Sequence, residues 1–166
     1  LRNLLQISLT NINTRVMNSV TTILSKDWIH MTTEKQFNKW ITKQFYEAYN
    51  KETSVQRIET TTGNGVPDLL VITPSEVWFI ESKFQTSNIR PEQLAWQIRA
   101  NEIIKNENTI VITMCAYPKT KRFLVCKYDR TSISSDKTKP LMIGEFSLNK
   151  KGFKEFINHF LASKLA

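Results

Sequence analysis

Three ionisable residues whose types suit metal-assisted chemistry occur within a short stretch of the chain: Asp68, Glu81 and Lys83. Residues 77–84 are predicted to form a strand whose side chains point alternately to its two faces, so Glu81 and Lys83, two positions apart, point to the same side. Burying such groups without partners would cost several kcal/mol for each. Pairing with one another, or with a bound cation, removes that cost, and two neighbouring carboxylates suit a hard divalent cation with oxygen ligands.

A divalent cation at this place indicates hydrolysis of a phosphate ester. Such a cation neutralises a phosphate, stabilises its developing charge and acidifies a water molecule, and a neighbouring lysine can orient that water or contact the phosphate. The alternative is a plain Glu81–Lys83 strand pair, with Asp68 capping a turn.

A helix over residues 34–49 should place a further carboxylate near these groups. Thr33 and Gln36 form a capping-box pattern that predicts the start of this helix. At 100° per residue, Glu34 falls in line with Phe37 and Ile41, so it begins the face that should be buried. The helix dipole explains why a Glu stands in the first turn, but not why it faces the core.

The remaining elements follow from apolar periodicity and turn residues. Strands are expected at residues 55–58, 69–73, 77–84, 109–117, 123–128 and 141–146, and helices at 91–105 and 151–165. Residues 131–140 read as a polar loop. This order predicts an α/β fold with a central mixed β-sheet flanked by helices.

The motifs around the three residues resemble those of a nuclease superfamily. Pro67-Asp68, with Glu81 lying 13 positions after Asp68 in Glu81-Ser82-Lys83, resembles the PD-(D/E)XK signature of the restriction-endonuclease-like nucleases. The chain is most similar to the virus-type replication-repair nuclease (VRR-NUC) domain, often encoded by phages. That group shows an early helix with a Glu, then Gly-x-Pro-Asp-Leu, then Glu-x-Lys, then a helix with a Gln followed by an aromatic residue. The matching positions here are Glu34, residues 65–69, residues 81–83, and Gln93 with Trp96, so the resemblance covers roughly residues 32–117.

This resemblance implies a restriction-endonuclease-like core of the order αβββαβ and a role for each motif residue. Mg²⁺, with Mn²⁺ as a substitute, would be bound by Asp68, Glu81, the backbone carbonyl of Ser82 and Glu34. Lys83 would assist the attacking water. Gln93 would support the site from its helix, and Gln97 is a rival for that role because helical geometry does not choose between them. The family often has an apolar residue where this chain has Ser82, whose side chain is expected to face away from the metal.

The implied activity is that of a Mg²⁺-dependent DNA endonuclease. It would be selective for branched, flap or junction DNA in phage or mobile-element replication, recombination or repair, and a homodimer is an analogy to junction-cutting relatives. Sequence-specific cleavage, as by restriction enzymes, is an alternative. A DNA-binding protein of the same fold without catalysis is another. A protein-interaction domain would leave the carboxylates unexplained.

The net charge of +8 is unevenly distributed, because residues 105–166 contain 12 Lys or Arg and only 5 Asp or Glu. This excess indicates an anionic partner. Candidate DNA contacts are a basic cluster between two predicted strands and two arginines near the motifs: Lys119, Lys121, Arg122, Arg57 and Arg90. A solvated hairpin explains the basic cluster equally well.

Composition excludes several other classes. The 166 residues, 40% of them hydrophobic, suit one folded domain. No apolar run approaches the roughly 20 residues of a membrane span, and no signal peptide is visible, so we expect a cytoplasmic protein without membrane contact. Cys115 and Cys126 lie in apolar runs and should be core residues. With His30 and His159 they show no spacing typical of zinc ligands.

Residues 1–30 differ in character from the rest of the chain. No clean period runs through them, whereas residues 31–166 should form a single nuclease domain with a motif-bearing core at about 32–128. We expect the first 30 residues to be a dispensable extension, with Met31 as a candidate start. The competing interpretation is an added helix that covers a sheet edge or helps to form a dimer.

Overall fold

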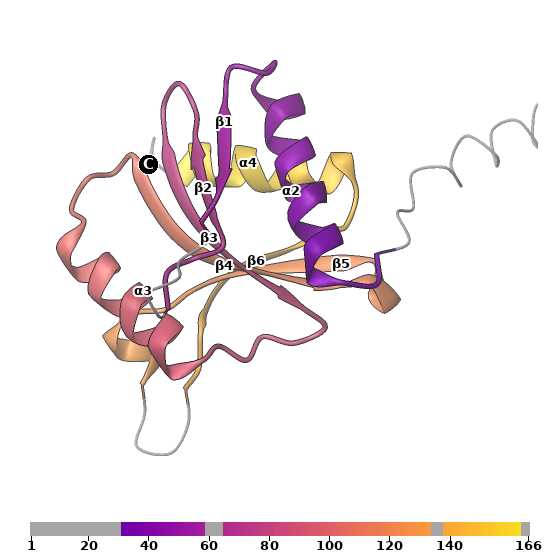
Figure 1. Cartoon of the computed structure of the whole chain (residues 1–166). Coiled ribbons are helices and arrows are strands. Elements are labelled where there is room, and N and C mark those ends of the chain that lie inside the picture. Colours follow the sequence, from indigo (N-terminus) through magenta and orange to yellow (C-terminus); the bar gives the residue numbers. More distant parts are fainter. Residues whose placement is uncertain (1–30, 59–64, 134–137, 164–166) are drawn as a thin grey trace, which may run out of the picture. The chain divides into compact units, whose positions relative to one another are not determined.

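The computed structural model describes residues 31–58, 65–133 and 138–163. They contain a six-stranded sheet whose strands lie side by side in the order of the sequence (Figure 1). The strands are β1 (Ser54–Arg57), β2 (Leu69–Ile72), β3 (Val77–Phe84), β4 (Thr109–Tyr117), β5 (Arg122–Lys127) and β6 (Leu141–Ser147). The predicted extension, residues 1–30, lies outside the described residues.

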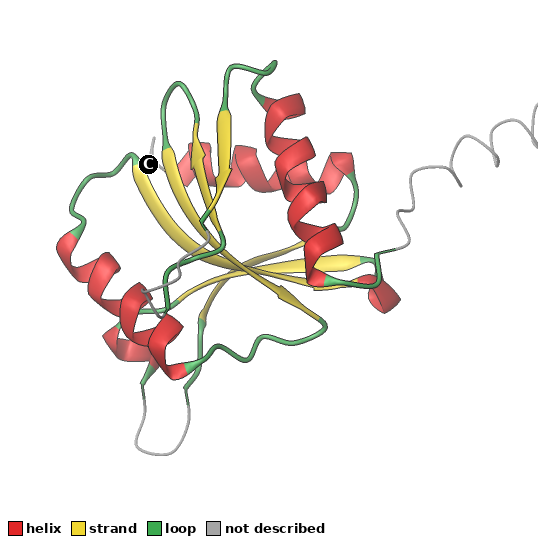
Figure 2. Ribbon diagram, in the orientation of Figure 1, coloured by secondary structure: helices red, strands yellow, loops and turns green. Residues whose placement is uncertain are grey.

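Neighbouring strands are antiparallel except for β3 and β4, which are parallel. Parallel neighbours need a crossover connection, and α3 (Pro91–Ile103) supplies it. The other helices are α2 (Glu34–Ala48) and α4 (Lys150–Ser163) (Figure 2). The predicted α/β class is confirmed, and so is the order αβββαβ, which appears as α2, β1, β2, β3, α3 and β4. Two short 3₁₀ turns, η1 (Pro118–Thr120) and η2 (Arg130–Ser132), were not predicted.

The first helix begins where its capping residues place it. The Thr33 hydroxyl accepts from the backbone N–H of Gln36 at 3.3 Å. In return, the Gln36 side chain accepts from the backbone N–H of Thr32 at 2.7 Å. These bonds satisfy donors that the first helical turn leaves without partners. No described helix combines the length and the apolar character needed to cross a membrane.

The hydrophobic core lies between the sheet and the pair α2 and α4. The face of β3 that carries Trp78 and Ile80 packs against both helices, with the Trp78 ring 5.4 Å from Phe45 and 5.7 Å from Phe156. Aromatic rings dominate this layer, since Trp40 of α2 also contacts Phe123 and Phe153. The core therefore fixes one face of β3 and leaves the opposite face to α3.

The layer between the sheet and α3 is more polar. The buried side chains of α3 are Gln93, Gln97 and Ala100, and the aromatic pair Phe79–Trp96 flanks them. Cys115 and Cys126 are buried free thiols, as predicted. A helix that turns glutamines toward a sheet needs polar partners there. The strand residues of this layer therefore include the candidate site.

A buried carboxylate outside this layer holds the turn between β2 and β3. Glu76 is 3% exposed, and its Oε2 accepts from the hydroxyls of Thr73 at 2.8 Å, Ser75 at 2.6 Å and Tyr49 at 3.2 Å. Tyr49 follows α2, so Glu76 ties the hairpin to the end of that helix.

Replacing Glu76 should therefore destabilise the fold. We expect Glu76→Ala to lower the free energy of unfolding by about 1–3 kcal/mol, because it removes the acceptor of the buried Thr73 hydroxyl and of the half-buried Tyr49 hydroxyl. Glu76→Gln, which keeps one acceptor oxygen, should cost less. Denaturant titrations at an unchanged m-value measure both. Glu155→Ala, in an exposed pair with Lys151, is the control and should stay within about 0.5 kcal/mol of wild type. A loss for Glu76→Ala no larger than that of the control would contradict this role.

Candidate active site

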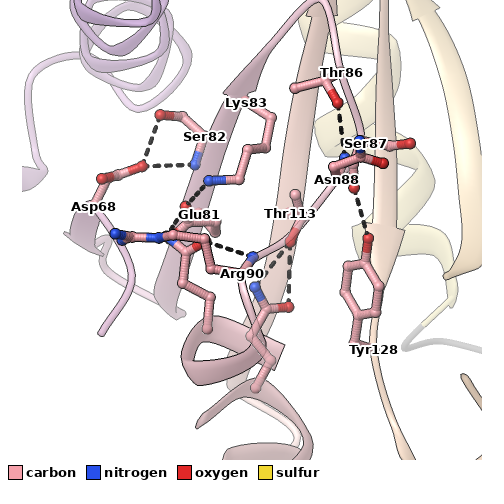
Figure 3. Close-up of polar contacts among 12 residues, drawn as sticks. Asp68, Glu81, Ser82, Lys83, Thr86, Ser87, Asn88, Arg90, Thr113 and Tyr128 are labelled. Atoms are coloured by element: carbon pink, nitrogen blue, oxygen red, sulfur yellow. Dashed lines mark hydrogen bonds and ion pairs between the residues drawn. The ribbon is translucent and has the colours of Figure 1, made fainter. Parts of the chain in front are cut away.

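Asp68 directly precedes the first residue of strand β2. Strand β3 continues past this point without pairing to β2. The last paired residues of the two strands are Leu69 and Ile80. Beyond Ile80, the Asp68 side chain takes the place of a strand neighbour, because its Oδ2 accepts from the backbone N–H of Ser82 at 2.9 Å. The same oxygen accepts from the Ser82 hydroxyl at 2.8 Å (Figure 3). The carboxylate is thus held at the part of the β3 edge that has no pairing with β2.

The Ser82 hydroxyl takes part in the candidate site. The sequence predicted that the Ser82 side chain would face away from the metal, which stays a prediction, and the structure shows that its Oγ contacts Asp68. The alternation of β3 does place Ser82 on the same face as Ile80. However, β2 does not extend alongside Ser82, so the short hydroxyl can contact the Asp68 carboxylate at the edge of the strand. Ser82 is fully buried. The sequence named only its backbone carbonyl as a site group, so the hydroxyl is the part that sequence reasoning missed.

A glycine allows the loop before Asp68 to approach α3 closely. Gly65 has a φ of +91°, which L side chains rarely adopt. A Cβ on Gly65 would also overlap the backbone carbonyl of Glu92, in the first turn of α3. Because these two backbones lie close together, Asp68 comes near Gln93, the residue of α3 that follows Glu92. The glycine of the motif is therefore a packing requirement.

Glu81 is the buried centre of the cluster. It is 1% exposed and faces α3, and its Oε1 accepts from Lys83 Nζ and Gln93 Nε2, each at 2.5 Å (Figure 3). Gln93 is held at its other end as well, since its Oε1 accepts from the backbone N–H of Arg90 at 3.1 Å. The second oxygen of Glu81, Oε2, is buried and has no hydrogen-bond partner among the described residues.

The structure distinguishes the two glutamines of α3. Gln93 contacts Glu81, whereas the fully buried Gln97 donates to the Thr113 hydroxyl at 2.8 Å. Thr113 lies beside Glu81 in the parallel register of β3 and β4. Gln97 thus supports the strand next to the site. Thr113 was not predicted as a supporting residue, although a threonine inside the apolar run of β4 was the signal that could have identified it.

The environment of Glu81 opposes its charge. Burial, and then the negative charge of Asp68, raise the pKa of Glu81 to about 7, although Lys83 acts in the opposite direction. A buried carboxyl group with a raised pKa and an oxygen that accepts no hydrogen bond is costly to keep charged, and a bound cation would remove that cost. The donor chemistry of Glu81 and Asp68 therefore fits a hard divalent cation.

Glu34 stands near these carboxylates without contacting them. The prediction that it faces the core is wrong, because Glu34 is exposed and the packed stripe of α2 begins one turn later at Phe37. Partial burial of its carboxyl group and the charge of Asp68 raise the pKa of Glu34, whereas Lys83, Arg90 and Arg57 lower it. Among the described residues, no three Asp, Glu, His or Cys side chains form a preformed metal cluster. A role for Glu34 as a ligand stays a prediction.

The predicted DNA-contacting residues fall into two groups. Arg57 ends β1 opposite Leu69, and Arg90 precedes α3, so both flank the carboxylates and both act on the charge of Glu34. Lys119 and Lys121 lie in the turn after β4, just past the end of its pairing with β3, and Arg122 is the first residue of β5. Arg122 forms an ion pair with Glu145 at 3.3 Å. This second group does not contact the carboxylate cluster.

The contact between Ser82 and Asp68 can be measured with a double-mutant cycle in the absence of metal. We expect Ser82→Ala to destabilise the wild type more than it destabilises the Asp68→Ala variant, with a coupling of about 1–2 kcal/mol, because the bond joins a hydroxyl to a carboxylate. Ser75→Ala, at the far end of β3, is the control and should be additive with Asp68→Ala within about 0.5 kcal/mol. An equally additive result for Ser82→Ala would mean that the bond contributes nothing.

Comparison with known proteins adds structural neighbours only. No family model matches the chain, and no curated protein matches it. Among solved structures, the chain is similar to a VRR_NUC domain, with a TM-score of 0.41 and 28% identity over 54% of this chain and 90% of that one. It is also similar to Hjc of Archaeoglobus fulgidus, a Holliday junction resolvase from an archaeal hyperthermophile, with a TM-score of 0.46 and 10% identity over 75% of this chain and 98% of that one. The first is a domain of the kind that the sequence motifs resemble.

Proposed function

We propose that this chain is a nuclease that hydrolyses phosphodiester bonds in DNA with the help of a divalent cation, Mg²⁺ or Mn²⁺. The observation that carries the proposal is the state of Glu81. One of its oxygens accepts from Lys83 and Gln93, and the other is buried without a hydrogen-bond partner among the described residues, near the charge of the Asp68 carboxylate. This arrangement is costly for a purely structural carboxylate and suitable for a metal ligand.

Three groups around the margin of β3 would hold the cation. Ser82 fixes Asp68 through Oδ2, and no described residue donates to Asp68 Oδ1. Glu81 offers its Oε2. The N–H and C=O of one strand residue point to the same edge, so the carbonyl of Ser82 points the same way as its N–H, toward Asp68. When bound, the cation supplies positive charge to the phosphate and makes a water molecule more acidic.

Lys83 and Glu34 complete the proposed roles. Lys83 is 9% exposed and its ammonium donates to Glu81, so it would orient the attacking water or contact the phosphate. Gln93 keeps Glu81 in place from α3. Glu34, near Asp68 but more exposed, would act at longer range, for example through a water bound to the cation.

DNA is the substrate that the charge distribution supports. The net charge is +8, and Arg57 and Arg90 lie on two sides of the carboxylates. Such charges bind a phosphate backbone without reading its sequence. The motif resemblance to VRR-NUC domains favours branched, flap or junction DNA over a sequence-specific site. A binding protein without catalysis is disfavoured because every group that the chemistry requires is present.

Cleavage should depend on the three central residues. We expect Asp68→Asn, Glu81→Gln and Lys83→Ala each to lower the rate on linear, flapped and four-way DNA by roughly a hundredfold or more, while circular dichroism shows a retained fold. The surface substitution Lys105→Ala is the control and should cut as wild type does. Substantial activity in Asp68→Asn, with contamination excluded, would refute the assignment. Binding of DNA without cleavage by the wild type would favour the inactive alternative, and cutting at one sequence in linear duplex would favour a restriction-type enzyme.

Cation binding can be tested without any substrate. Mg²⁺ or Mn²⁺ should raise the melting temperature of the wild type by several degrees, because a ligand of the folded state at a hundred times its Kd contributes about 2.7 kcal/mol. Asp68→Asn should abolish most of this rise, whereas the exposed control Glu145→Gln should keep it. Equal responses of both variants to the metal would place cation binding elsewhere.

A further inference from the structure

Four lysines surround a hollow on the outer side of α2, which we call the lysine hollow. Its volume is about 660 Å³. Lys39 and Lys43 come from α2, and Lys51 comes from the turn that follows it. Lys150 is the first residue of α4. All four lysines are exposed, so the hollow opens to solvent between the two helices.

The lysine hollow keeps an excess of positive charge. Glu47 is the one carboxylate among the described residues that line it, so four lysines and one glutamate leave a charge of +3. Glu47 forms ion pairs with Lys43 at 3.7 Å and with Lys150 at 3.1 Å, and it thereby holds together two ammonium groups from different helices. Within the described part of the chain, Lys39 and Lys51 form no ion pair.

Lys51 has an uncommon backbone conformation. Its φ is +67°, and that of the preceding Asn50 is +50°. A left-handed Asn is an ordinary helix end, and the cap is complete because the backbone N–H of Lys51 donates to the carbonyl of Tyr46 at 2.8 Å. A second left-handed residue that is not glycine costs conformational energy. Such strain tends to persist where a side chain has a function, and here the strained residue lines the hollow.

A row of lysines connects the candidate active site with the lysine hollow. Lys35, Lys39 and Lys43 are spaced by four residues on α2, so they follow one side of the helix at intervals of about 6 Å. The helix begins at Glu34, which interacts electrostatically with Asp68. The row therefore leads away from the carboxylates along the length of α2.

Regularly spaced cations suit a polyanion whose charges are also regularly spaced. Each strand of a DNA duplex carries one phosphate per about 3.4 Å of its axis, and lysines bind phosphates without reading the bases. A lipid surface is anionic as well, but a helix that lies on one inserts apolar side chains between its cations. The other residues that line the hollow are Thr42, Tyr46 and Asn50, which all carry polar groups. Duplex DNA is thus the better match.

We propose that the lysine row and the lysine hollow bind the backbone of a DNA duplex arm that extends from the cleaved bond. The 15 residues of α2 span about 22 Å, which is the length of about 6–7 base pairs. A paired arm would have to extend about this far from the cleavage site to reach Lys51 and Lys150. The inference rests on the proposed nuclease function and adds the surface that holds the substrate and the arm length that it needs.

The first test measures binding to a blunt duplex of about 30 base pairs in EDTA, so that no cleavage occurs, over a range of salt concentrations. Lys39→Ala/Lys51→Gly should weaken binding about threefold or more and reduce the slope of log affinity against log salt by about two, because each phosphate contact contributes about 0.9. The variant should melt at the same or a higher temperature than wild type, since glycine adopts a positive φ without strain.

The control removes the same charge elsewhere. Lys105→Ala/Lys139→Ala should leave the slope as in wild type. Glu47→Gln, which removes the carboxylate of the hollow, should instead strengthen binding. Equal losses of slope in the two double variants would show that only net charge counts and would overturn the proposal. Binding of phosphatidylglycerol vesicles that is lost in Lys39→Ala/Lys51→Gly, with duplex binding unchanged, would overturn it in favour of a lipid surface.

The second test varies the arm length in cleavage with Mg²⁺. Two substrates have the same cleavage site and paired arms of about 4 or about 12 base pairs on both sides. We expect wild type to show a lower KM on the long-armed substrate, with the same kcat on both. Lys39→Ala/Lys51→Gly should lose most of this difference in KM, because it lacks the contacts that the longer arm reaches. A difference that persists in full in the variant would contradict the proposal.

The outcomes also separate this inference from the proposed function. A wild type that cuts no DNA with Mg²⁺, while Lys39→Ala/Lys51→Gly loses salt slope in EDTA and the control does not, would refute the nuclease and leave the duplex-binding surface standing. A wild type that cuts both arm lengths with one KM, together with an unchanged slope in Lys39→Ala/Lys51→Gly, would refute the surface and leave the nuclease standing.

Discussion

The structure depends on how one buried carboxylate is accommodated. Glu81 is almost fully shielded from water, and within the described part of the chain Lys83 and Gln93 are the side chains that donate hydrogen bonds to it. Those two contacts require a lysine two residues along the same strand and a helix that turns glutamine toward the sheet. The polar layer under α3 follows from this requirement, because Gln97 and Thr113 continue the same pattern next to Glu81. The aromatic layer under α2 and α4 then carries the hydrophobic stabilisation on the other face.

A second constraint is that β2 is shorter than β3, so the last residues of β3 have no strand neighbour on that side. Because pairing between β2 and β3 stops at Leu69 and Ile80, the backbone of Ser82 needs another acceptor, and Asp68 supplies it. The carboxylate thereby completes the edge of the sheet and is oriented by it. Structural and chemical roles coincide at this residue, so a substitution of Asp68 acts on both, and stability has to be measured alongside activity.

The sequence predicted most of the fold, because long periodic segments define their own elements. Strands β3 and β4 have the predicted bounds, and Cys115 and Cys126 are core residues. The site was predicted less completely. The helical wheel of α2 could not show that Glu34 precedes the first buried residue of the helix. Strand alternation could not show that Ser82 lies where β3 has no neighbour from β2, so that its hydroxyl contacts Asp68. Both features lie at element ends, where local periodicity no longer describes what surrounds a side chain. Which glutamine meets Glu81 likewise depended on the packing of α3 against the sheet.

The order of the sheet gives the chain an inherent division. Each strand pairs with its neighbour in sequence, so the segment 31–84 builds β1, β2 and β3, and the segment 91–163 builds the remaining strands. Asp68, Glu81, Ser82 and Lys83 all belong to the first segment, and Gln93 belongs to the second. The two meet through the parallel pair β3 and β4, across the connection 85–90, and through the aromatic core, where Trp78 contacts Phe156. The chemical groups and their support thus come from two contiguous halves of one chain, and recovery of function on mixing separately made halves would report on the joint formation of that pair of strands and of the aromatic core.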